Sequence, residues 1–410
     1  MFDTLRGAGQ YLGSHSTSGE NTSTTQLTSF DTDGFTTGLS GGTNQSGQTY
    51  AAWTWDAGDN QPSTGHSSIL YKGSGGAISL KGFGFSPDLV WIKNRDGTAQ
   101  NHMLFDSVRG PNLRIQSDGN ATEFNQTNSL ISFDADGFSF GTSTGNLNST
   151  SSNYVAWGWD AGDGDPVTNT TGDINSTVKA SNTTGFSVVS YTGDGSASST
   201  VGHGLGSSAS MLIVKDRAVA NNWRVWHKDL SANHWLYLNL TNAEASGATD
   251  GGIRNVDANT FGFINGTTAG VEAVNTNGRN YIAYAFSEVS GVSKFGTYTG
   301  NGSTAGPVIT TGFRPGFLLV KKTSGSAAWQ LIDGTRDPFA NPASQVLYPD
   351  FSDAEYTWSG GAWNFTSTGF QPTRSDTDFN GNCETLKSYL IVLLILGILY
   401  MTSMKTIERR

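Results

Sequence analysis

One aromatic segment recurs along this chain and limits the folds that the chain can adopt. It reads YVAWGWDAGD at residues 154–163 and YAAWTWDAGD at residues 50–59. A looser copy, YIAYAFSEVSG, occupies residues 281–291. A chain that repeats its most aromatic segment at wide intervals is a tandem array of one type of domain. The sequence therefore predicts several copies of a single folding unit.

The pattern inside this segment predicts a β-strand. Successive side chains of a strand point to opposite faces, so Val155, Trp157 and Trp159 share one face. The opposite face, with Ala156 and Gly158, is small. Aromatic strand faces are usually buried, and we expect this one to lie between the two sheets of a β-sandwich. The alternative is an exposed Trp-x-Trp pair that stacks on sugars.

Two further segments recur at a nearly constant offset. FDTLRG at residues 2–7 returns as FDSVRG at 105–110, and FDTDGF at 30–35 returns as FDADGF at 133–138; both offsets are 103 residues. This constancy predicts that residues 1–60 are the C-terminal half of a repeat. We expect the chain either to be a fragment at this end or to pair there with something else, because an unpaired half-sandwich exposes sheet edges and a core face.

Each later unit contains a short apolar run that ends in lysine. Such runs, preceded by turn residues, predict strands that are buried on both faces. No stretch before residue 385 shows a sustained helical period, so the predicted fold class is all-β, with each unit a compact antiparallel two-sheet sandwich. The runs are Leu89–Lys93, Met211–Lys215 and Phe317–Lys321, and the predicted sandwich repeats span 61–165, 166–292 and 293–382, the last incomplete at its end.

The connections between the units differ in length. Residues 162–184 are rich in Gly, Asp, Asn and Thr and are predicted to be a linker. Residues 288–293 are too few to give much freedom, so the second and third units are expected to pack as a pair.

Charge and cysteine content exclude some classes of function. The net charge is −10, and Lys and Arg do not cluster before the last few residues. A polyanion partner requires a basic patch, so we expect no nucleic-acid binding. The chain has a single cysteine, Cys383, and so no intrachain disulfide. An all-β array without disulfides is ordinary for a bacterial or viral surface protein.

The C-terminal residues 383–410 depart from the repeat. An aromatic strand is expected there, but residues 389–401 read YLIVLLILGILYM, and a basic end follows. Thirteen apolar residues fall short of the roughly 20 that span a bilayer as a helix. Three interpretations stay open: a reading-frame change that leaves a non-native tail, a short membrane-associating segment, and a buried terminal strand or helix.

Several acidic motifs resemble parts of a calcium loop. Asp31-x-Asp33-Gly34 and Asp134-x-Asp136-Gly137 stop after two carboxylates, and Asp376-x-Asp378-x-Asn380-Gly381 has Lys387 at the twelfth position, where the loop needs Glu. We interpret all three as turns. The carboxylates of residues 160–165 either bind a cation weakly or form a solvated linker. The six histidines lack metal-ligand spacing, so no metal and no cofactor are predicted.

No sequence motif assigns a catalytic residue. A nucleophile elbow, a phosphate loop and a strand-borne Glu pair are all missing from the sequence. A glycan depolymerase stays open, because the carboxylates of glycosidases come from distant strands. Trp223, at a polar strand start, is the best candidate for an exposed residue that stacks on a ligand; core or inter-domain packing is the alternative.

Several of these segments together resemble a known group of proteins. GFSVVSYTGDGSASSTVGHGLG (185–206), YIAYAFSEVSGVSKFGTYTGNG (281–302) and TGFRPGFLLVK (311–321), with the YVAWGWDAG and FDSVRG segments, are similar to tandem domains of marine bacteriophage tail-fibre-like and virion structural proteins. The resemblance implies a concanavalin-like or jelly-roll sandwich on a virion appendage, and it carries no site residues. The C-terminus departs from it, because relatives continue with an aromatic strand of the YIYMAF kind.

The resemblance and the composition together give the expected function. We expect a non-enzymatic phage tail-fibre or appendage protein, located in the virion and extracellular when acting. It would be a rigid string of sandwiches that contacts other virion proteins and host-surface glycans, and three chains would associate as fibres commonly do. The alternatives are a structural virion protein without receptor contact and a cell-surface adhesin held by residues 389–401.

Overall fold

The structure is a computed structural model, and it is all-β, as predicted. It describes residues 2, 8–11, 21–31, 34–39, 43–47, 65–96, 100–142, 144–247, 251–265, 272–337, 341–381 and the backbone of 388–393. The helical elements with described bounds are short: η1 (Gly145–Leu147) and α2 (Glu272–Asn275). The chain divides into two units, Met1–Ala57 with Leu399–Arg410, and Gly58–Ile398. Each unit is described by itself.

The larger unit contains three sandwiches, which we call modules A (66–159), B (167–286) and C (293–393). Module A pairs a six-stranded sheet, in the order β10-β9-β8-β7-β13-β5, with a three-stranded sheet, β11-β12-β6. All its ladders are antiparallel. Its strands are β5 (His66–Lys72), β6 (Ile78–Lys81), β7 (Leu89–Asn94), β8 (Met103–Asp106), β9 (Leu113–Gln116), β10 (Phe124–Asn125), β11 (Leu130–Asp134), β12 (Gly137–Phe140) and β13 (Asn153–Trp159).

Module B has a six-stranded sheet, β14-β15-β16-β24-β18-β19, a three-stranded sheet, β17-β23-β22, and the small pair β20-β21. Part of the stretch predicted to be a linker forms the two strands at one edge of the larger sheet, β14 and β15, so the linker prediction is wrong for 167–169 and 176–181. The strands are β14 (Val167–Asn169), β15 (Ser176–Ser181), β16 (Phe186–Thr192), β17 (Thr200–Gly202), β18 (Met211–Asp216), β19 (Arg224–His227), β20 (His234–Trp235), β21 (Ala245–Ser246), β22 (Gly252–Arg254), β23 (Thr260–Ile264) and β24 (Asn280–Phe286).

Module C has the sheets β25-β33-β27-β28 and β26-β32-β31 and the hairpin β29-β30. Its last strand, β33 (Ser388–Leu393), pairs with both β25 and β27. The same central place is held by β13 in module A and by β24 in module B. The other strands are β25 (Ser293–Tyr298), β26 (Ile309–Thr310), β27 (Phe317–Lys322), β28 (Gln330–Asp333), β29 (Gln345–Val346), β30 (Tyr356–Thr357), β31 (Trp363–Thr366) and β32 (Gly369–Pro372).

Strand β33 revises the expectation for the C-terminus. The apolar run begins with the central strand that the third repeat needs, so the interpretation as a terminal strand holds for 388–393, and the third repeat does not stop at residue 382. The remaining residues of the tail, 382–387 and 394–410, lie outside the described residues.

A repeated polar clamp shows that the modules are copies of one design. In each module a tyrosine on a strand that pairs with the central strand (β5, β16 or β25) donates its hydroxyl to the carbonyl just before an asparagine. These bonds join Tyr71 to Leu147, Tyr191 to Val274 and Tyr298 to Phe379. The asparagine amide then donates across to a loop carbonyl of the same module. These amide pairs are Asn148–Gly76, Asn275–Ser196 and Asn380–Ser303. The predicted repetition is therefore confirmed at the level of single hydrogen bonds.

The N-terminal unit repeats part of module A. Hairpin β3 (Leu27–Asp31) with β4 (Gly34–Thr37) has the register of β11 with β12, including the irregularity after the first pair. The pair β1 (Gln10–Tyr11) with β2 (Asn21–Thr22) likewise matches β9 with β10 at the offset of 103 residues. These hairpins agree with the prediction that residues 1–60 correspond to the second half of a repeat.

The indole face of β13 is buried, but not where the sequence predicts. Tyr154 and Ala156 face the core between the two sheets of module A. Val155, Trp157 and Trp159 point the other way, into a second core that all three modules build. The expectation that the tryptophans join the two sheets of one sandwich is wrong, because both faces of the larger sheet are covered.

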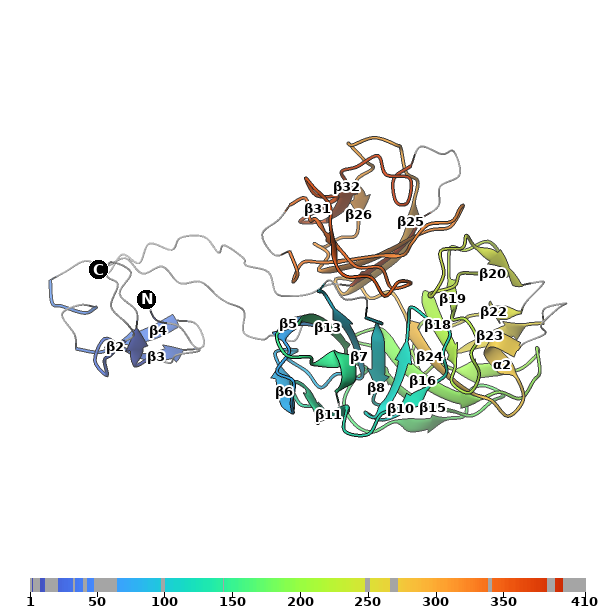
Figure 1. Ribbon diagram of the computed structural model, residues 1–410, viewed down its shortest axis with the longest axis horizontal. Helices are drawn as coiled ribbons and strands as arrows, with labels where there is room; N and C mark the ends of the chain where they lie inside the picture. Colours follow the sequence, from blue (N-terminus) through green and yellow to red (C-terminus); the bar gives the residue numbers. More distant parts are fainter. Residues whose placement is uncertain are drawn as a thin grey trace. The chain divides into compact units, whose positions relative to one another are not determined.

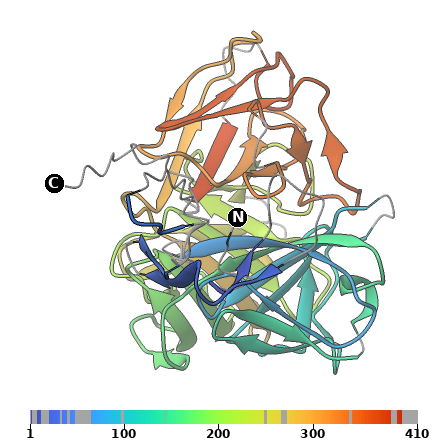
Figure 2. The ribbon, with the colours of Figure 1, turned by 90° about the vertical axis from the view of Figure 1, so that its left-hand side faces the viewer.

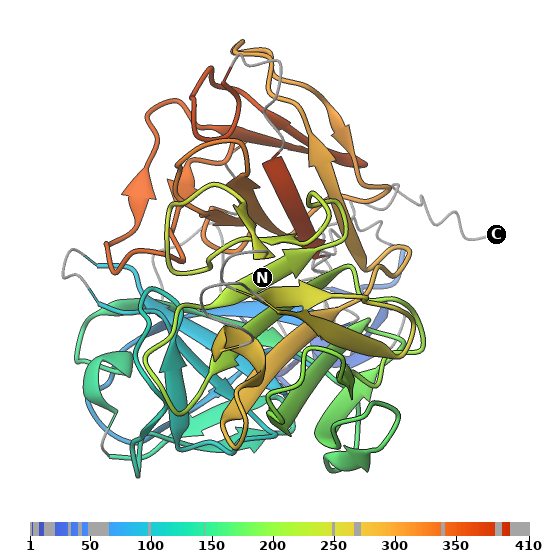
Figure 3. The ribbon, with the colours of Figure 1, turned by 90° about the vertical axis from the view of Figure 1, so that its right-hand side faces the viewer.

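The shared core brings the three modules together around one centre. It takes Leu89 and Trp91 from module A, Met211 and Ile213 from module B, and Phe317 and Leu319 from module C. The alternate residues of these same strands fill the separate cores of the modules. Figure 1 shows the three lobes, coloured blue to teal, green to yellow and orange to red, around this centre, and Figures 2 and 3 show them from two sides. The modules form a closed cluster and not the expected string.

Candidate functional site

The contacts between the modules repeat around the cluster, so they form a ring with pseudo-threefold symmetry. The amide N–H of Glu123 in module A donates to Arg217 O in module B. Equivalent bonds join Glu244 of B to Thr323 of C, and Glu355 of C to Arg95 of A. Because each module uses the same edge toward the next one, the ring closes after three copies.

Buried ion pairs reinforce two of these three seams. In the A/B seam, Arg109 Nε lies 2.6 Å from Asp106 Oδ2, and its Nη1 lies 2.9 Å from Glu123 Oε2. Glu123 also accepts bonds from Arg217. Burial acts to raise the pKa of Glu123, but the bonds from Arg217 and Arg109 outweigh it and lower that pKa. The C/A seam repeats the network with Arg336, Asp333, Glu355 and Arg95.

The B/C seam lacks this network. The register places His227 where Asp106 and Asp333 stand, and Leu230 where the arginines stand. Glu244 accepts a bond from Ser231 Oγ at 2.6 Å instead. The backbone bonds of Glu123, Glu244 and Glu355 therefore repeat at all three seams, while the side-chain network is present at two of them.

A buried lysine marks the end of the same strand in each module. Lys93 donates to the carbonyls of Gln100 and Ser352, and Lys321 donates to those of Thr241 and Ala327. In both cases one acceptor belongs to a neighbouring module. Lys215 is the equivalent residue of module B, and burial lowers the pKa of all three lysines to about 8. Lys93 and Lys321 are thus parts of the seams, whereas Lys215 donates to the carbonyl of Asp216 in its own module.

Trp223 is part of a seam and not an exposed stacking residue. Its side chain is fully buried, and its Nε1 donates to Gln116 O of module A at 2.8 Å. Trp329 makes the equivalent bond from module C to Tyr237 O of module B. The polar context of Trp223 suggests exposure, but the partner of its indole N–H comes from another module. Inter-domain packing is the interpretation that holds.

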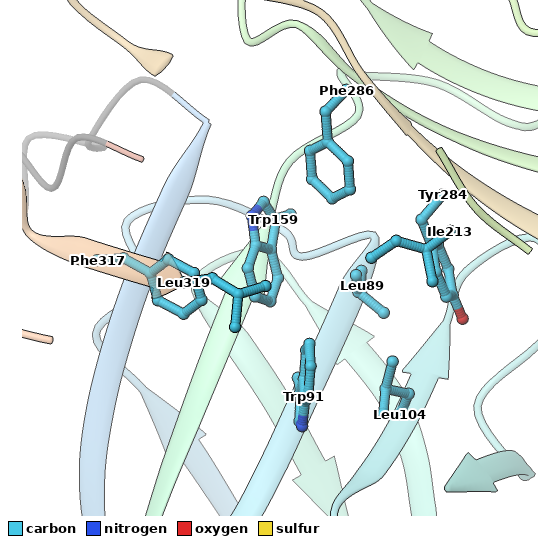
Figure 4. Close-up of a pocket in the computed structure, with 9 residues that line it drawn as sticks. All are labelled: Leu89, Trp91, Leu104, Trp159, Ile213, Tyr284, Phe286, Phe317 and Leu319. Atoms are coloured by element: carbon cyan, nitrogen blue, oxygen red, sulfur yellow. The ribbon is translucent and has the colours of Figure 1, made fainter. Parts of the chain in front are cut away.

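The centre of the ring contains a small void that cannot be a ligand site. Its volume is about 20 Å³, and Figure 4 shows the indoles of Trp91 and Trp159 and the rings of Phe286 and Phe317 around it. This volume is enough for roughly one water molecule, and a buried water needs at least two polar partners. The wall is apolar, so the void belongs to the packing of the shared core.

An open groove of about 420 Å³ lies at the junction of modules A and B. It is built by the turn before β7, the end of β11, the segment 162–166 and strand β15. Strand β15 lies in the stretch that joins β13 to β16. At the B/C connection six residues (287–292) join β24 to β25, so that connection contains no counterpart of β15. Its volume falls within the range of small-molecule sites.

The floor of the groove is a fixed ion pair. Lys179 Nζ lies 2.7 Å from Asp88 Oδ1, and Asp88 is 1% exposed. Ser107 Oγ donates to the same oxygen at 2.6 Å, and the N–H of Ala161 donates to the other at 2.8 Å. The carboxylate of Asp88 is therefore held in place and orients Lys179 and Ser107.

The walls of the groove are more accessible. Phe133 is half-buried and packs its inner side against the core of module A. Asp163 and Asp165 also line the groove and are exposed. Nearby, burial raises the pKa of Asp160, and the charges of Asp88 and Asp163 act in the same direction. The groove thus offers one aromatic surface, fixed polar groups and two free carboxylates.

The candidate metal motifs prove to be turns wherever the structure describes them. Asp134 accepts bonds from Ser132 and Ser139, and Asp136 Oδ1 accepts the N–H of Gly84. Asn380 is the clamp residue of module C, so its amide is already used. Asp31 and Gly34 pair in a hairpin, while Asp33 and His15 lie outside the described residues. Among the described residues, no three of His, Cys, Asp or Glu are grouped so as to hold a metal ion.

The fold defines a protein of three β-sandwiches that close into a ring around a shared aromatic core. A family model described as a domain of unknown function, DUF7483, matches residues 1–65 and 61–390, and the chain belongs to this family. No curated protein and no solved structure matches the chain. Within the described residues, no helix is long and apolar enough to cross a membrane.

Proposed function

We propose that this protein is a non-enzymatic component of a phage tail fibre or other virion appendage, and that it attaches to host-surface glycans through the groove between modules A and B. The observation that carries the proposal is the composition of this groove: a half-buried aromatic ring, Phe133, faces fixed polar groups and free carboxylates. Sugars are bound in this way, because their C–H faces lie on aromatic rings while their hydroxyls need donors and acceptors.

The charge of the groove limits the classes of sugar that it can bind. Its lysine is committed to Asp88, while Asp163 and Asp165 remain free to accept bonds from sugar hydroxyls. An acidic polysaccharide would meet like charge there without a free cation to compensate. Neutral or amino sugars are therefore favoured over acidic ones.

The closed ring suits an appendage. Three modules with a common core present the groove on a rigid body, so little entropy is lost when a ligand binds. The resemblance to marine phage tail-fibre-like and virion structural proteins supports the same assignment. An association of three chains, contacts with other virion proteins and the location in the virion are further parts of this proposal.

The test is adsorption of the full chain to host cells and to their purified envelope polysaccharide. We expect the wild type to bind, Phe133→Ala to lose about tenfold in affinity, and Phe124→Ala to bind normally. Phe124 is a matched control, because it is an aromatic residue of module A that is 54% exposed and lies outside the groove. We expect no release of reducing ends. Absence of any adsorption by the wild type would refute the proposal and favour a purely structural virion protein.

A further inference from the structure

Module C carries an aromatic surface that is separate from the groove. We call it the aromatic platform: Tyr348, Phe351, Tyr356 and Trp358, four rings within eleven residues around hairpin β29-β30. Phe351 is 40% exposed and Tyr356 is 49% exposed, while the other two are half-buried. The rings meet edge to face, with centroids 6.3 Å apart for Tyr348 and Phe351 and 5.2 Å apart for Tyr356 and Trp358.

The half-buried rings of the platform, Tyr348 and Trp358, are held in place by packing against the core of module C. Trp358 lies against Phe379, a buried residue of the core of module C, with ring centroids 6.1 Å apart. The guanidinium of Arg374 covers the Trp358 ring at 4.8 Å and donates to Ser359 O. Tyr348 also packs against this core. Rings that are already immobile lose little entropy when a ligand covers them.

The pseudo-symmetry shows that the shared fold of the modules does not require the two exposed rings, Phe351 and Tyr356. The bonds of Glu123, Glu244 and Glu355 define equivalent positions in the three modules. Each glutamate lies eight positions after a residue paired with the preceding strand, which is Ile115, Leu236 or Leu347. The positions of the platform then correspond to Gln116, Gly119, Phe124 and Gln126 in module A and to Tyr237, Leu240, Ala245 and Gly247 in module B. Only module C has an aromatic residue at all four.

We propose that the aromatic platform of module C is a second sugar-binding surface, which takes the C–H face of neutral pyranose residues. This inference rests on the proposed attachment to glycans and adds a second point of contact. Exposed rings that the scaffold does not need mark a binding surface, and a pyranose ring matches an aromatic face in size and polarity.

The polar rim of the platform selects the kind of sugar. Burial raises the pKa of Tyr348 to about 12, and the neighbouring Tyr356, Asp376 and Asp378 add to the effect. The Tyr348 phenol is thus neutral at physiological pH and able to donate and accept hydrogen bonds. The aspartates accept bonds from hydroxyls and repel an acidic sugar.

Binding of the full chain to an array of neutral, amino and acidic glycans tests the inference. We expect Tyr356→Ala and Phe351→Ala each to reduce affinity for neutral glycans about five- to tenfold. Tyr356→Phe keeps the ring and is expected to retain most of the binding. Phe124→Ala is the matched control, because Phe124 is the equivalent of Tyr356 in module A and is equally exposed on its hairpin. Near-UV circular dichroism checks that each variant is folded.

The outcomes separate this inference from the proposed function. If Phe133→Ala weakens binding and the platform variants do not, the inference falls and attachment through the groove stands. If only the platform variants weaken binding, the inference stands and the groove is not the attachment site. Binding confined to acidic glycans, or no binding by the wild type, overturns the inference in either case.

Discussion

Trp157 of module A donates its indole N–H to Asp333 of module C at 3.0 Å, and Tyr284 of module B donates its hydroxyl to Asp106 of module A at 2.8 Å. The two donors occupy the same register position on the central strands β13 and β24. In module C the position of the two donors is occupied by Ile391 on β33. In module B the position of the two aspartates is occupied by His227. The donor and the acceptor are thus lost together at the B/C seam.

Removing the arginine of the A/B seam tests how much that seam stabilises the fold. Arg109→Ala leaves the buried carboxylate of Asp106 without its arginine partner and removes one of the bonds that Glu123 accepts, while Arg217 still donates to Glu123. We expect a loss of about 3–5 kcal/mol in the free energy of unfolding. Urea denaturation of the full chain measures it. Lys228→Ala removes an ion pair with Glu288 in which both partners are partly exposed, and is expected to cost at most about 1 kcal/mol. Equal losses in the two variants would contradict a stabilising role for the buried network.

Removing the indole N–H of Trp223 deletes a single hydrogen bond between modules A and B, and is a smaller change than removing Arg109. Trp223→Phe keeps most of the buried volume and removes the bond to Gln116 O, leaving that carbonyl without the donor. We expect a loss of about 1–3 kcal/mol in stability. Trp226→Phe, in strand β19 three residues further on but only half-buried, is the control and should change stability less. Unchanged stability in Trp223→Phe would mean that the seam bond contributes nothing.

His66 makes the ring sensitive to acid. Its imidazole packs against Trp159 at 4.6 Å and Phe317 at 5.0 Å, and burial lowers its pKa to about 3, although the charge of Asp333 acts to raise it. The unfolded chain binds the proton near pH 6.5, so this contribution to stability is complete above pH 6.5 and is lost as the pH falls toward 3.

The variant His66→Phe isolates this effect from the other titrations. The difference in unfolding free energy between wild type and variant should stay constant above pH 6.5. Below it, the difference should shift against the wild type by about 1.4 kcal/mol per pH unit. Denaturant titrations between pH 3 and pH 8 measure it. Parallel curves for the two proteins would show that His66 does not titrate on unfolding.

The sequence predicts the repeats, the all-β class and the burial of Trp157 and Trp159, because each of these follows from a local pattern. It does not predict which core receives the indoles. Both faces of β13 are covered. The alternation of side chains along a strand shows which residues share a face, but it does not show which sheet or module packs against that face. Packing of Trp223 between domains is among the interpretations of the sequence, but its partner is not predicted, because the acceptor lies 107 residues away in another module.

The sequence does not predict the groove, because the residues that form it are far apart along the chain. The groove joins Asp88 to Lys179 through strand β15, whose residues have the composition of a linker. The buried arginines, in contrast, can be identified from a spacing that repeats in the sequence. The segment FDSVRG holds Asp106 and Arg109 three residues apart, and LIDGTR repeats this spacing with Asp333 and Arg336. Module B has His227 and Leu230 at these positions, so comparing the repeats position by position identifies the seam that lacks the buried Asp–Arg pair.

Grafting the missing pair tests whether the seams are interchangeable. His227→Asp and Leu230→Arg place the residues of the A/B seam into the B/C seam, where Glu244 already occupies the position of Glu123. Each single variant buries a charge without its partner and should destabilise the protein. The double variant should recover about 0.5–3 kcal/mol relative to the sum of the single effects. A double-mutant cycle by urea denaturation measures this coupling. Strict additivity would show that the B/C seam has diverged in backbone geometry as well as in side chains, since the grafted groups would then not meet.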